Sequence, residues 1–117
     1  MKDRLTAGDV LAGLEKMADD LTAHADELRE LDAAIGDGDL GITVTIGFQA
    51  VREALDGLRD SDIATMVMRS GMAFNRKAAS TFGALYATMM MRAARVAKGR
   101  TEIGPGELAD MLDAAVE

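Results

Sequence analysis

Apolar side chains recur at helical spacing along most of the chain, and this periodicity restricts the fold more than any other feature. The sustained alternation of polar and apolar residues that marks half-buried strands is absent. The only proline is Pro105, so no proline interrupts a helix before that point. The sequence therefore predicts an all-α protein, an antiparallel up-and-down helical bundle. The first apolar stripe comprises Val10, Leu14, Met17, Leu21 and Leu28.

Start and stop signals divide the chain into five predicted helices. The first begins after the N-cap residue Thr6 and runs to about Leu28, and a loop rich in Gly and Asp is expected over residues 31–40. Asp60 or Ser61 is the expected N-cap of the third helix. The five helices are expected over residues 6–28, 41–58, 61–74, 81–97 and 107–117.

The last predicted helix, over residues 107–117, stops without a glycine, a basic last turn or any other C-cap signal. We therefore expect residues 1–117 to form a single domain that is the N-terminal part of a longer one, truncated at its C-terminus. Such a bundle would bury its core incompletely. It would then associate with itself or require the missing segment.

Composition argues against several classes of function. The 117 residues suit one domain, and an apolar content of 49% indicates a globular chain. A net charge of −7 and the absence of Trp make nucleic acid an unfavourable partner. No apolar run has the length of a membrane span or of a signal-peptide core, and no Cys is present to form a disulfide. These features are those of a cytoplasmic protein that is not bound to a membrane.

The stretch Ile35–Thr43, IGDGDLGIT, matches three ligand-binding templates in part. Its glycines spell the dinucleotide fingerprint G-x-G-x-x-G, but a helix rather than a strand precedes them, and two Asp residues would repel a pyrophosphate. A P-loop would need a lysine at Ile42. A calcium loop beginning at Asp37 would need Gly at Ile42 and Glu at Phe48. None of the three templates is satisfied.

The distribution of charge gives another interpretation of this loop. Two carboxylates about 5 Å apart repel by roughly 3 kcal/mol at an effective dielectric constant near 20. A loop that gathers several must spread them into water, raise their pKa values or hold a cation. Oxygen-only ligands select a hard cation such as Mg²⁺, although a solvated Asp-Gly-Asp turn is the alternative. No Lys or Arg lies between Arg29 and Arg52, a gap that contains Glu30, Asp32, Asp37 and Asp39.

Two longer segments carry a family resemblance. The first is LDAAIGDGDLG at residues 31–41 with Gly47-Phe48 after it, and the second, residues 70–94, contains SGMAF and GALYATMMMRAA. In the same order, both resemble sequence blocks of the L subunit of dihydroxyacetone kinase, the DhaL-type nucleotide-binding domain. The first block of that family reads L-D-x-x-I-G-D-x-D-H-G.

This resemblance implies an all-helical up-and-down barrel that binds ADP or ATP at one end. It implies that two Mg²⁺ ions hold the nucleotide through three aspartates, which map onto Asp32, Asp37 and Asp39. In that family a separate K subunit binds dihydroxyacetone, and the L subunit carries the phosphoryl group. The implied activity is phosphoryl transfer to dihydroxyacetone or a related small keto- or hydroxy-sugar, with ATP or a phosphocarrier protein as donor. No residue of this chain is expected to be a catalytic acid or base.

The phosphate side of the implied site departs from the family pattern. Leu40 replaces a histidine, and Phe82 replaces the serine of a Gly-Gly-x-Ser-Gly loop that reads Ala79–Gly83 here. Arg76 and Lys77 are candidate phosphate contacts that would compensate. A module that senses ADP or ATP without chemistry, or a bundle that metal merely stabilises, is therefore also considered. The expected nucleotide-binding residues are Leu40, Gly41, Thr43, Ser80, Thr81 and Gly83.

The other distinctive side chains are expected to be structural. His24 is the only histidine, and we expect it to pack or to lie on the surface. Tyr86 has the right character to flank an adenine, but we expect it in the core. Methionine adapts to irregular shapes and so suits a ligand cavity as well as a core, and the core is expected here. The methionines concerned are Met66, Met68, Met72 and Met89–Met91.

Overall fold

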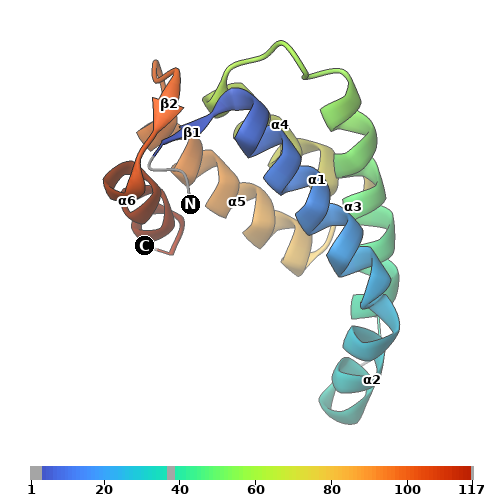
Figure 1. Ribbon diagram of the computed structural model, residues 1–117. Helices are drawn as coiled ribbons and strands as arrows, with labels where there is room; N and C mark the ends of the chain where they lie inside the picture. The colour runs from blue at the N-terminus through green and yellow to red at the C-terminus, as the bar shows by residue number, and fades with distance from the viewer. Residues whose placement is uncertain (1–3, 37–38, 117) are drawn as a thin grey trace.

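The protein is almost entirely helical, as the periodicity predicts. The structure is a computed structural model that describes residues 4–36 and 39–116. Within those residues it forms a bundle of six helices and a two-residue strand pair, with no closed barrel (Figure 1). The elements are β1 (Leu5–Thr6), α1 (Ala7–Ala23), α2 (Ala25–Ile35), α3 (Leu40–Asp56), α4 (Ile63–Lys77), α5 (Thr81–Ala97), β2 (Glu102–Ile103) and α6 (Pro105–Ala115).

Helices α3, α4 and α5 form the centre of the bundle. Each packs against the next, and short connections make them antiparallel in turn, so α3 and α5 run in the same direction. Helix α1 lies against α3, and α6 lies against α5 (Figure 1). Helix α2 packs mainly on α3 and projects from one end of the bundle. The starts of α3 and α5 therefore lie at the same end.

An aromatic cluster forms the core between these central helices. The rings of Phe48 and Phe74 meet edge to face with centroids 4.9 Å apart, and Tyr86 meets Phe48 at 5.3 Å in the same manner. Edge-to-face contacts are the favoured geometry for aromatic pairs. Val51 and Leu55 on α3 are fully buried beside them. Phe48 and Leu55 were placed on the buried face of their helix by the sequence pattern, which is confirmed.

The strand pair joins the two ends of the described chain. Leu5 pairs with Ile103 and Thr6 with Glu102 in antiparallel register. Glu107 supports this junction, because its Oε1 accepts a hydrogen bond from the Gly104 N–H at 3.1 Å and lies 3.4 Å from Arg4 Nη1. The bond from Gly104 holds the pKa of Glu107 below its ordinary value. Strands of two residues are too short to show an alternating pattern, so the sequence did not predict them.

Several predicted boundaries were wrong, including the start of the last helix, which begins at Pro105 rather than Glu107. The first helix ends at Ala23 rather than Leu28, because the His24 N–H bonds both Asp20 O and Leu21 O and tightens the last turn. A separate α2 then occupies the first half of the expected loop, residues 31–35. The N-cap of α4 is Asp62 rather than Asp60 or Ser61, and its Oδ1 accepts a bond of 2.7 Å from the Thr65 N–H.

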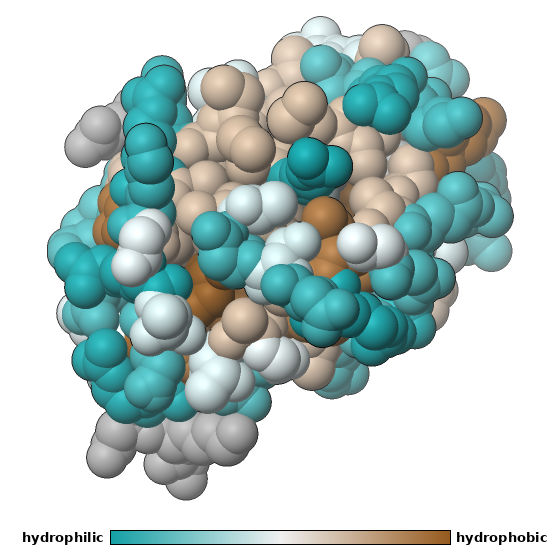
Figure 2. Space-filling model, turned by 90° about the horizontal axis from the view of Figure 1, so that it is seen from above, coloured by the Kyte–Doolittle hydropathy of each residue, from teal (hydrophilic) through white to brown (hydrophobic). Residues whose placement is uncertain are grey.

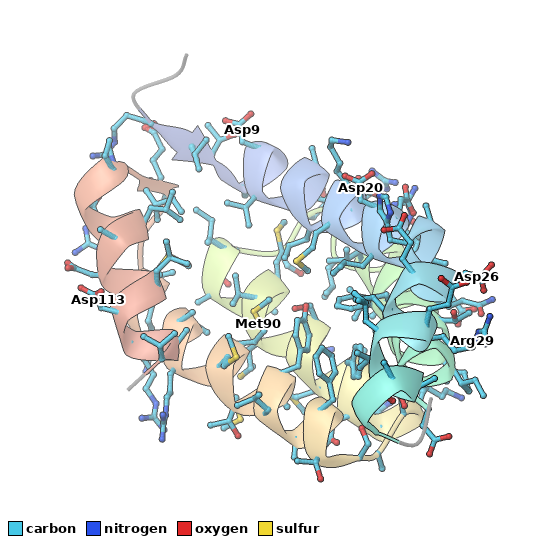
Figure 3. The ribbon with its side chains drawn as sticks, turned by 90° about the horizontal axis from the view of Figure 1, so that it is seen from below. Asp9, Asp20, Asp26, Arg29, Met90 and Asp113 are labelled. Carbon is cyan, nitrogen blue, oxygen red and sulfur yellow. The ribbon has the colours of Figure 1, made fainter. Side chains whose placement is uncertain are left out.

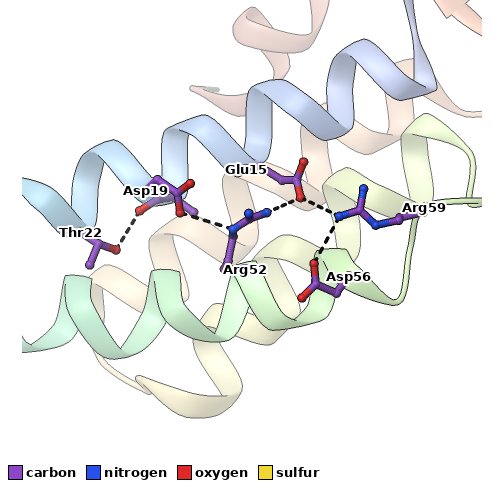
Figure 4. A network of polar contacts seen from close by, with 7 residues as sticks. Glu15, Asp19, Thr22, Arg52, Asp56 and Arg59 are labelled. Atoms are coloured by element: carbon purple, nitrogen blue, oxygen red, sulfur yellow. Dashed lines mark hydrogen bonds and ion pairs between the residues drawn. The ribbon is translucent and has the colours of Figure 1, made fainter.

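A chain of ion pairs fixes α1 against α3 (Figure 4). Glu15 on α1 accepts a hydrogen bond from Arg52 on α3 and lies 3.4 Å from Arg59 Nη2. Arg52 Nε lies 3.4 Å from Asp19 Oδ1, and Arg59 is also 3.6 Å from Asp56 Oδ1. The hydrogen bond to Glu15 raises the pKa of Arg52 above its ordinary value. Because these groups are partly exposed, their main effect is to select the register of α1 rather than to add much stability.

The surface mixes apolar and polar side chains. In the view of Figure 2, hydrophilic groups lie between and around weakly hydrophobic ones. Within residues 4–36 and 39–116, no helix combines the length and apolar character needed to cross a membrane.

Gly47 gives a test of the central packing. A Cβ at Gly47 would overlap the ring carbons of Phe74, whereas a Cβ at Gly13 in α1 would meet nothing within 4 Å. Both substitutions raise helix propensity, so comparing them isolates the clash. We expect Gly47→Ala to lower the free energy of unfolding by about 1–3 kcal/mol, and Gly13→Ala to raise it by about 0.5–1 kcal/mol. Urea denaturation measures both, and equal effects would contradict the packing described.

Candidate functional site

The candidate site lies at the end of the bundle where α3 and α5 begin. The N–H groups of a helix's first turn are not bonded within the helix, and the helix dipole adds positive potential there. Anions therefore bind readily at such ends. The side chains of Leu40, at the start of α3, and Phe82, at the start of α5, pack against one hydrophobic cluster. The two helix starts thus share one part of the core.

Asp32 connects the acidic loop to the first of these helices. It lies on α2, and its Oδ2 accepts a hydrogen bond of 3.2 Å from the backbone N–H of Leu40. The carboxylate therefore stands at the positive end of α3, where a negative charge is stabilised. This hydrogen bond joins residues eight positions apart in the sequence, and a turn whose carboxylates are merely solvated would not need such a bond.

Gly36 is needed for this arrangement. A Cβ at Gly36 would lie only 2.5 Å from Asp32 Oδ1 and 3.0 Å from its carbonyl oxygen. Glycine thus lets the chain pass directly beside the second oxygen of the carboxylate. Oδ1 of Asp32 therefore lies beside Gly36 in the loop, while Oδ2 accepts the hydrogen bond from the Leu40 N–H.

The other two predicted metal ligands are less fully described. Asp39 is exposed and precedes α3, and its carbonyl accepts the Thr43 N–H at 3.0 Å. Asp37 lies outside the described residues. Among the residues that the structure describes, no three carboxylate, His or Cys groups lie close enough to hold a metal ion. The ligand set with Asp37 therefore stays a prediction.

Gly41 has a packing role in addition to its predicted ligand role. A Cβ at this position would lie 2.7 Å from both Ala25 O and Arg29 Cβ. Glycine therefore lets α2 and α3 approach closely. Beside it is a shallow pocket of about 230 Å³ lined by Arg29, Ile42 and Thr45, among others.

Arg29 is a site candidate that the sequence reasoning missed. It lies on the outer edge of α2 together with Asp26 (Figure 3). It is also the last cation before the gap in positive charge, and this position was the available signal.

Ser80 caps α5. Its hydroxyl accepts a hydrogen bond of 2.9 Å from the Gly83 N–H and donates one of 3.0 Å to Ala78 O. Gly83 is required here, because a Cβ would lie 2.6 Å from Ala78 O. Thr81 follows on the exposed side. The Ser80 hydroxyl is thus already used within the protein, and a phosphate at this end would have to share it.

The substituted positions mostly face inward. Phe82 packs against Phe74 with ring centroids 5.5 Å apart, so its side chain joins the core instead of blocking the helix start. Leu40 is half-buried on the same cluster, and Thr43 is half-buried on α3. What Leu40 presents to the loop is therefore its backbone N–H.

Arg76 and Lys77 are exposed on the last turn of α4. Basic residues are stabilised there by the helix dipole, which explains them without a ligand. Lys77 also lines a shallow pocket of about 240 Å³ with Ile46, Gln49 and Glu53 of α3. It therefore lies near the middle of α3.

The residues expected to be structural are mostly so. Tyr86 is buried in the aromatic cluster, and its hydroxyl lies 3.4 Å from Ser70 Oγ. Burial raises the pKa of Tyr86 to about 12, so it stays protonated at neutral pH. His24 is exposed and contacts Glu27 Oε1 through Nδ1 at 2.9 Å. Met66 is buried and Met90 packs on the core, pointing into the bundle in Figure 3.

Three of the methionines contradict the expectation of a core position. Met68, Met72 and Met91 are exposed. They lie on the faces of α4 and α5 that point away from the buried residues. Counting apolar residues does not show on which face of a helix each one lies.

Comparison with known proteins identifies the family. Residues 34–117 match the DAK2 domain. The chain belongs to the DAK2-domain family. This DAK2 protein is 38% identical over 101 residues to a Listeria innocua protein named PEP-dependent dihydroxyacetone kinase 2, ADP-binding subunit DhaL, which covers 85% of this chain and 47% of the relative.

A second relative carries a similar name. The Escherichia coli PEP-dependent dihydroxyacetone kinase, ADP-binding subunit DhaL, is 29% identical over 108 residues, covering 92% of this chain and 51% of that protein. The DAK2 chain thus spans about half the length of the curated relatives it matches. Its predicted kinship with DhaL-type domains is confirmed.

The cap of α5 gives a test at the site itself. Ser80→Ala removes the acceptor of the Gly83 N–H, so we expect the free energy of unfolding to fall by about 1 kcal/mol. Thr81→Ala removes a neighbouring exposed hydroxyl, and we expect a change of less than about 0.5 kcal/mol. Chemical denaturation of both variants measures the difference. Equal losses would show that Ser80 is not the cap.

Proposed function

We propose that this chain is the nucleotide-binding part of a dihydroxyacetone-kinase L-type subunit. It binds ADP or ATP with Mg²⁺ at the end of the bundle where α3 and α5 begin. It passes a phosphoryl group to dihydroxyacetone, or a related small keto- or hydroxy-sugar, held by a partner K-type subunit. The chain corresponds in this proposal to the N-terminal portion of a longer domain.

One observation carries the proposal. Asp32 Oδ2 accepts a hydrogen bond from the Leu40 N–H, so an acidic loop is fastened to the positive end of a helix. Both relatives described above are named ADP-binding subunits, which supports a nucleotide as the ligand. A helix end with an adjacent carboxylate loop suits a phosphate chain that arrives with divalent cations.

The available donors fit a hard cation. Asp32 and Asp39 offer only carboxylate oxygens, and Gly36 leaves the chain free to pass beside Asp32 Oδ1. Asp32, Asp37 and Asp39 would hold the metal, with two ions shared with the phosphates. Magnesium supplies neutralisation and alignment of the phosphates in such sites.

This chain's residues would position the nucleotide rather than move protons. Ser80, Thr81 and the first backbone N–H groups of α5 would face the phosphates. Because they have no side chain, Gly41 lets the start of α3 pack closely on α2, and Gly83 lets the start of α5 pack closely on the backbone of Ala78. The acceptor sugar comes from the K-type subunit, and the donor is ATP or a phosphocarrier protein.

Replacing the loop carboxylates tests the metal sites. We expect Asp37→Asn or Asp39→Asn to weaken Mg²⁺-dependent ADP binding by at least about 100-fold, because each removes a charged ligand. Helical content should stay unchanged. Isothermal titration calorimetry with and without Mg²⁺ measures the affinity, and Asp60→Asn, in the exposed α3–α4 connection, is the matched control. ADP binding as tight as in the parent protein would refute the carboxylates as ligands.

A sensor that binds ADP or ATP without chemistry is the second candidate. The observation that favours it is the altered start of α5, where Ala79 and Phe82 stand in the phosphate loop and Ser80 is engaged as a cap. If the start of α5 holds the terminal phosphate weakly, the chain would still bind the nucleotide but would transfer the phosphoryl group slowly. A basic side chain close to that phosphate would restore the transfer.

Lys77 separates these two candidates. A charged hydrogen bond to phosphate contributes about 1.5–3 kcal/mol, or roughly ten- to hundred-fold in affinity. If Lys77 contacts the terminal phosphate, Lys77→Ala should weaken ATP binding by that factor more than ADP binding. Lys16→Ala, an exposed cation on α1, is the control. Calorimetry with each nucleotide measures the ratio, and unchanged affinities for both would favour the sensor.

A further inference from the structure

The outer side of the α4–α5 pair carries a groove that the proposed nucleotide site does not use. It has a volume of about 330 Å³ and is lined by Ala64, Thr65 and Met68 of α4 and by Met91, Ala94 and Arg95 of α5, with the cap residues Asp62 and Lys98. These residues belong to the first turns of α4 and the last turns of α5. Because α5 has 17 residues, the groove is about 20 Å from the helix start at Ser80.

Methionine dominates the apolar part of this groove. Met68 is 37% exposed and Met91 is 43% exposed, and both line it. Met72, one turn beyond Met68 and outside the lining, is 46% exposed. Exposed methionines are flexible and polarisable, and proteins use them on surfaces that bind the apolar faces of helices.

Positive charge is concentrated around the same helices. Residues 63–101 contain seven of the 13 Lys and Arg residues of the chain and none of its 20 Asp and Glu residues. Arg69, Arg95 and Lys98 are exposed and take part in no ion pair with any residue that the structure describes. The carboxylate of Asp62 at the edge is engaged by the Thr65 N–H. The groove is therefore cationic within a strongly acidic protein.

We propose that this groove binds an acidic amphipathic helix of a partner protein. Helices dock into grooves through apolar anchors at positions i, i+3 or i+4 and i+7. Met68 and Met91 would receive those anchors, and Arg95 and Lys98 would pair with flanking Asp or Glu. Charge complementarity would speed the encounter and fix the orientation of the helix. A concave apolar surface with cations at one end suits a helix better than the flat surface of a membrane.

A designed peptide tests this surface directly. The probe is a helix of about 15 residues, matched to the length of α5, with Leu at i, i+4 and i+7 and Glu on both flanks. Its reference is the same peptide with every Glu replaced by Gln. Fluorescence anisotropy with the full chain should show binding of the Glu peptide that weakens with salt, and binding of the Gln peptide at least about tenfold weaker.

Two double variants locate the contact. Met68→Ser with Met91→Ser, and Arg95→Gln with Lys98→Gln, should each weaken binding at least about tenfold. The charge pair should also flatten the salt dependence, and Lys16→Gln is the control. If the methionine pair unfolds the protein, by circular dichroism, the exposed charge pair decides. Unchanged affinity in the charge pair, or an equal loss in the control, overturns the proposal.

Two further results would assign the groove to another occupant. Sedimentation velocity of the chain alone that shows a dimer broken by the charge pair would make a second copy the occupant. Binding to vesicles of anionic phospholipid that the charge pair abolishes, without binding of the Glu peptide, would make a membrane the occupant. Either result overturns the proposal.

Discussion

The contact between Gly47 and the ring of Phe74 determines how closely α3 and α4 approach. Because Gly47 has no side chain, the ring lies directly on the backbone of α3, and Phe48 and Tyr86 complete the cluster around it. Helices that approach this closely leave little freedom in their angle, since neighbouring side chains must interlock. The relative positions of the starts of α3 and α5 depend on this packing. The geometry of the candidate site is therefore set in the core, about two helical turns away from the start of α3.

The sequence predicted the parts of the fold that repeat and missed those that occur once. Helices α3 and α4 follow from the apolar spacing of Val44, Phe48, Val67 and Phe74, each of which is buried. The break at His24 does not follow, because neither glycine nor proline marks it and the signal is a single tightened turn. Exposed Met68 and Met91 were expected inside, since periodicity counts methionine as apolar wherever it falls.

The same distinction applies to the candidate site. Asp32 lies in the gap in positive charge between Arg29 and Arg52, and its bond to the Leu40 N–H explains why it stands next to the loop. Ser80 was recognisable from the sequence as a hydroxyl residue at a helix start, and its hydroxyl caps α5 by accepting the Gly83 N–H. The packing role of Gly41 could not be read from the sequence. The atoms that it approaches belong to α2, a helix that the sequence did not predict as a separate element. Contacts between elements depend on angles and distances that spacing along the chain does not contain.

The pairing of Leu5 with Ile103 has a consequence for the order in which the protein assembles. Contacts along α3, α4 and α5 join segments that are neighbours in sequence, and such local contacts form early. The strand pair closes a loop of almost the whole chain, which costs more entropy and comes late. During synthesis on a ribosome, β1 is made before β2 and must wait for it while the central helices fold. The residues of β1 are thus among the last to be fixed, although they are made before α3, α4 and α5.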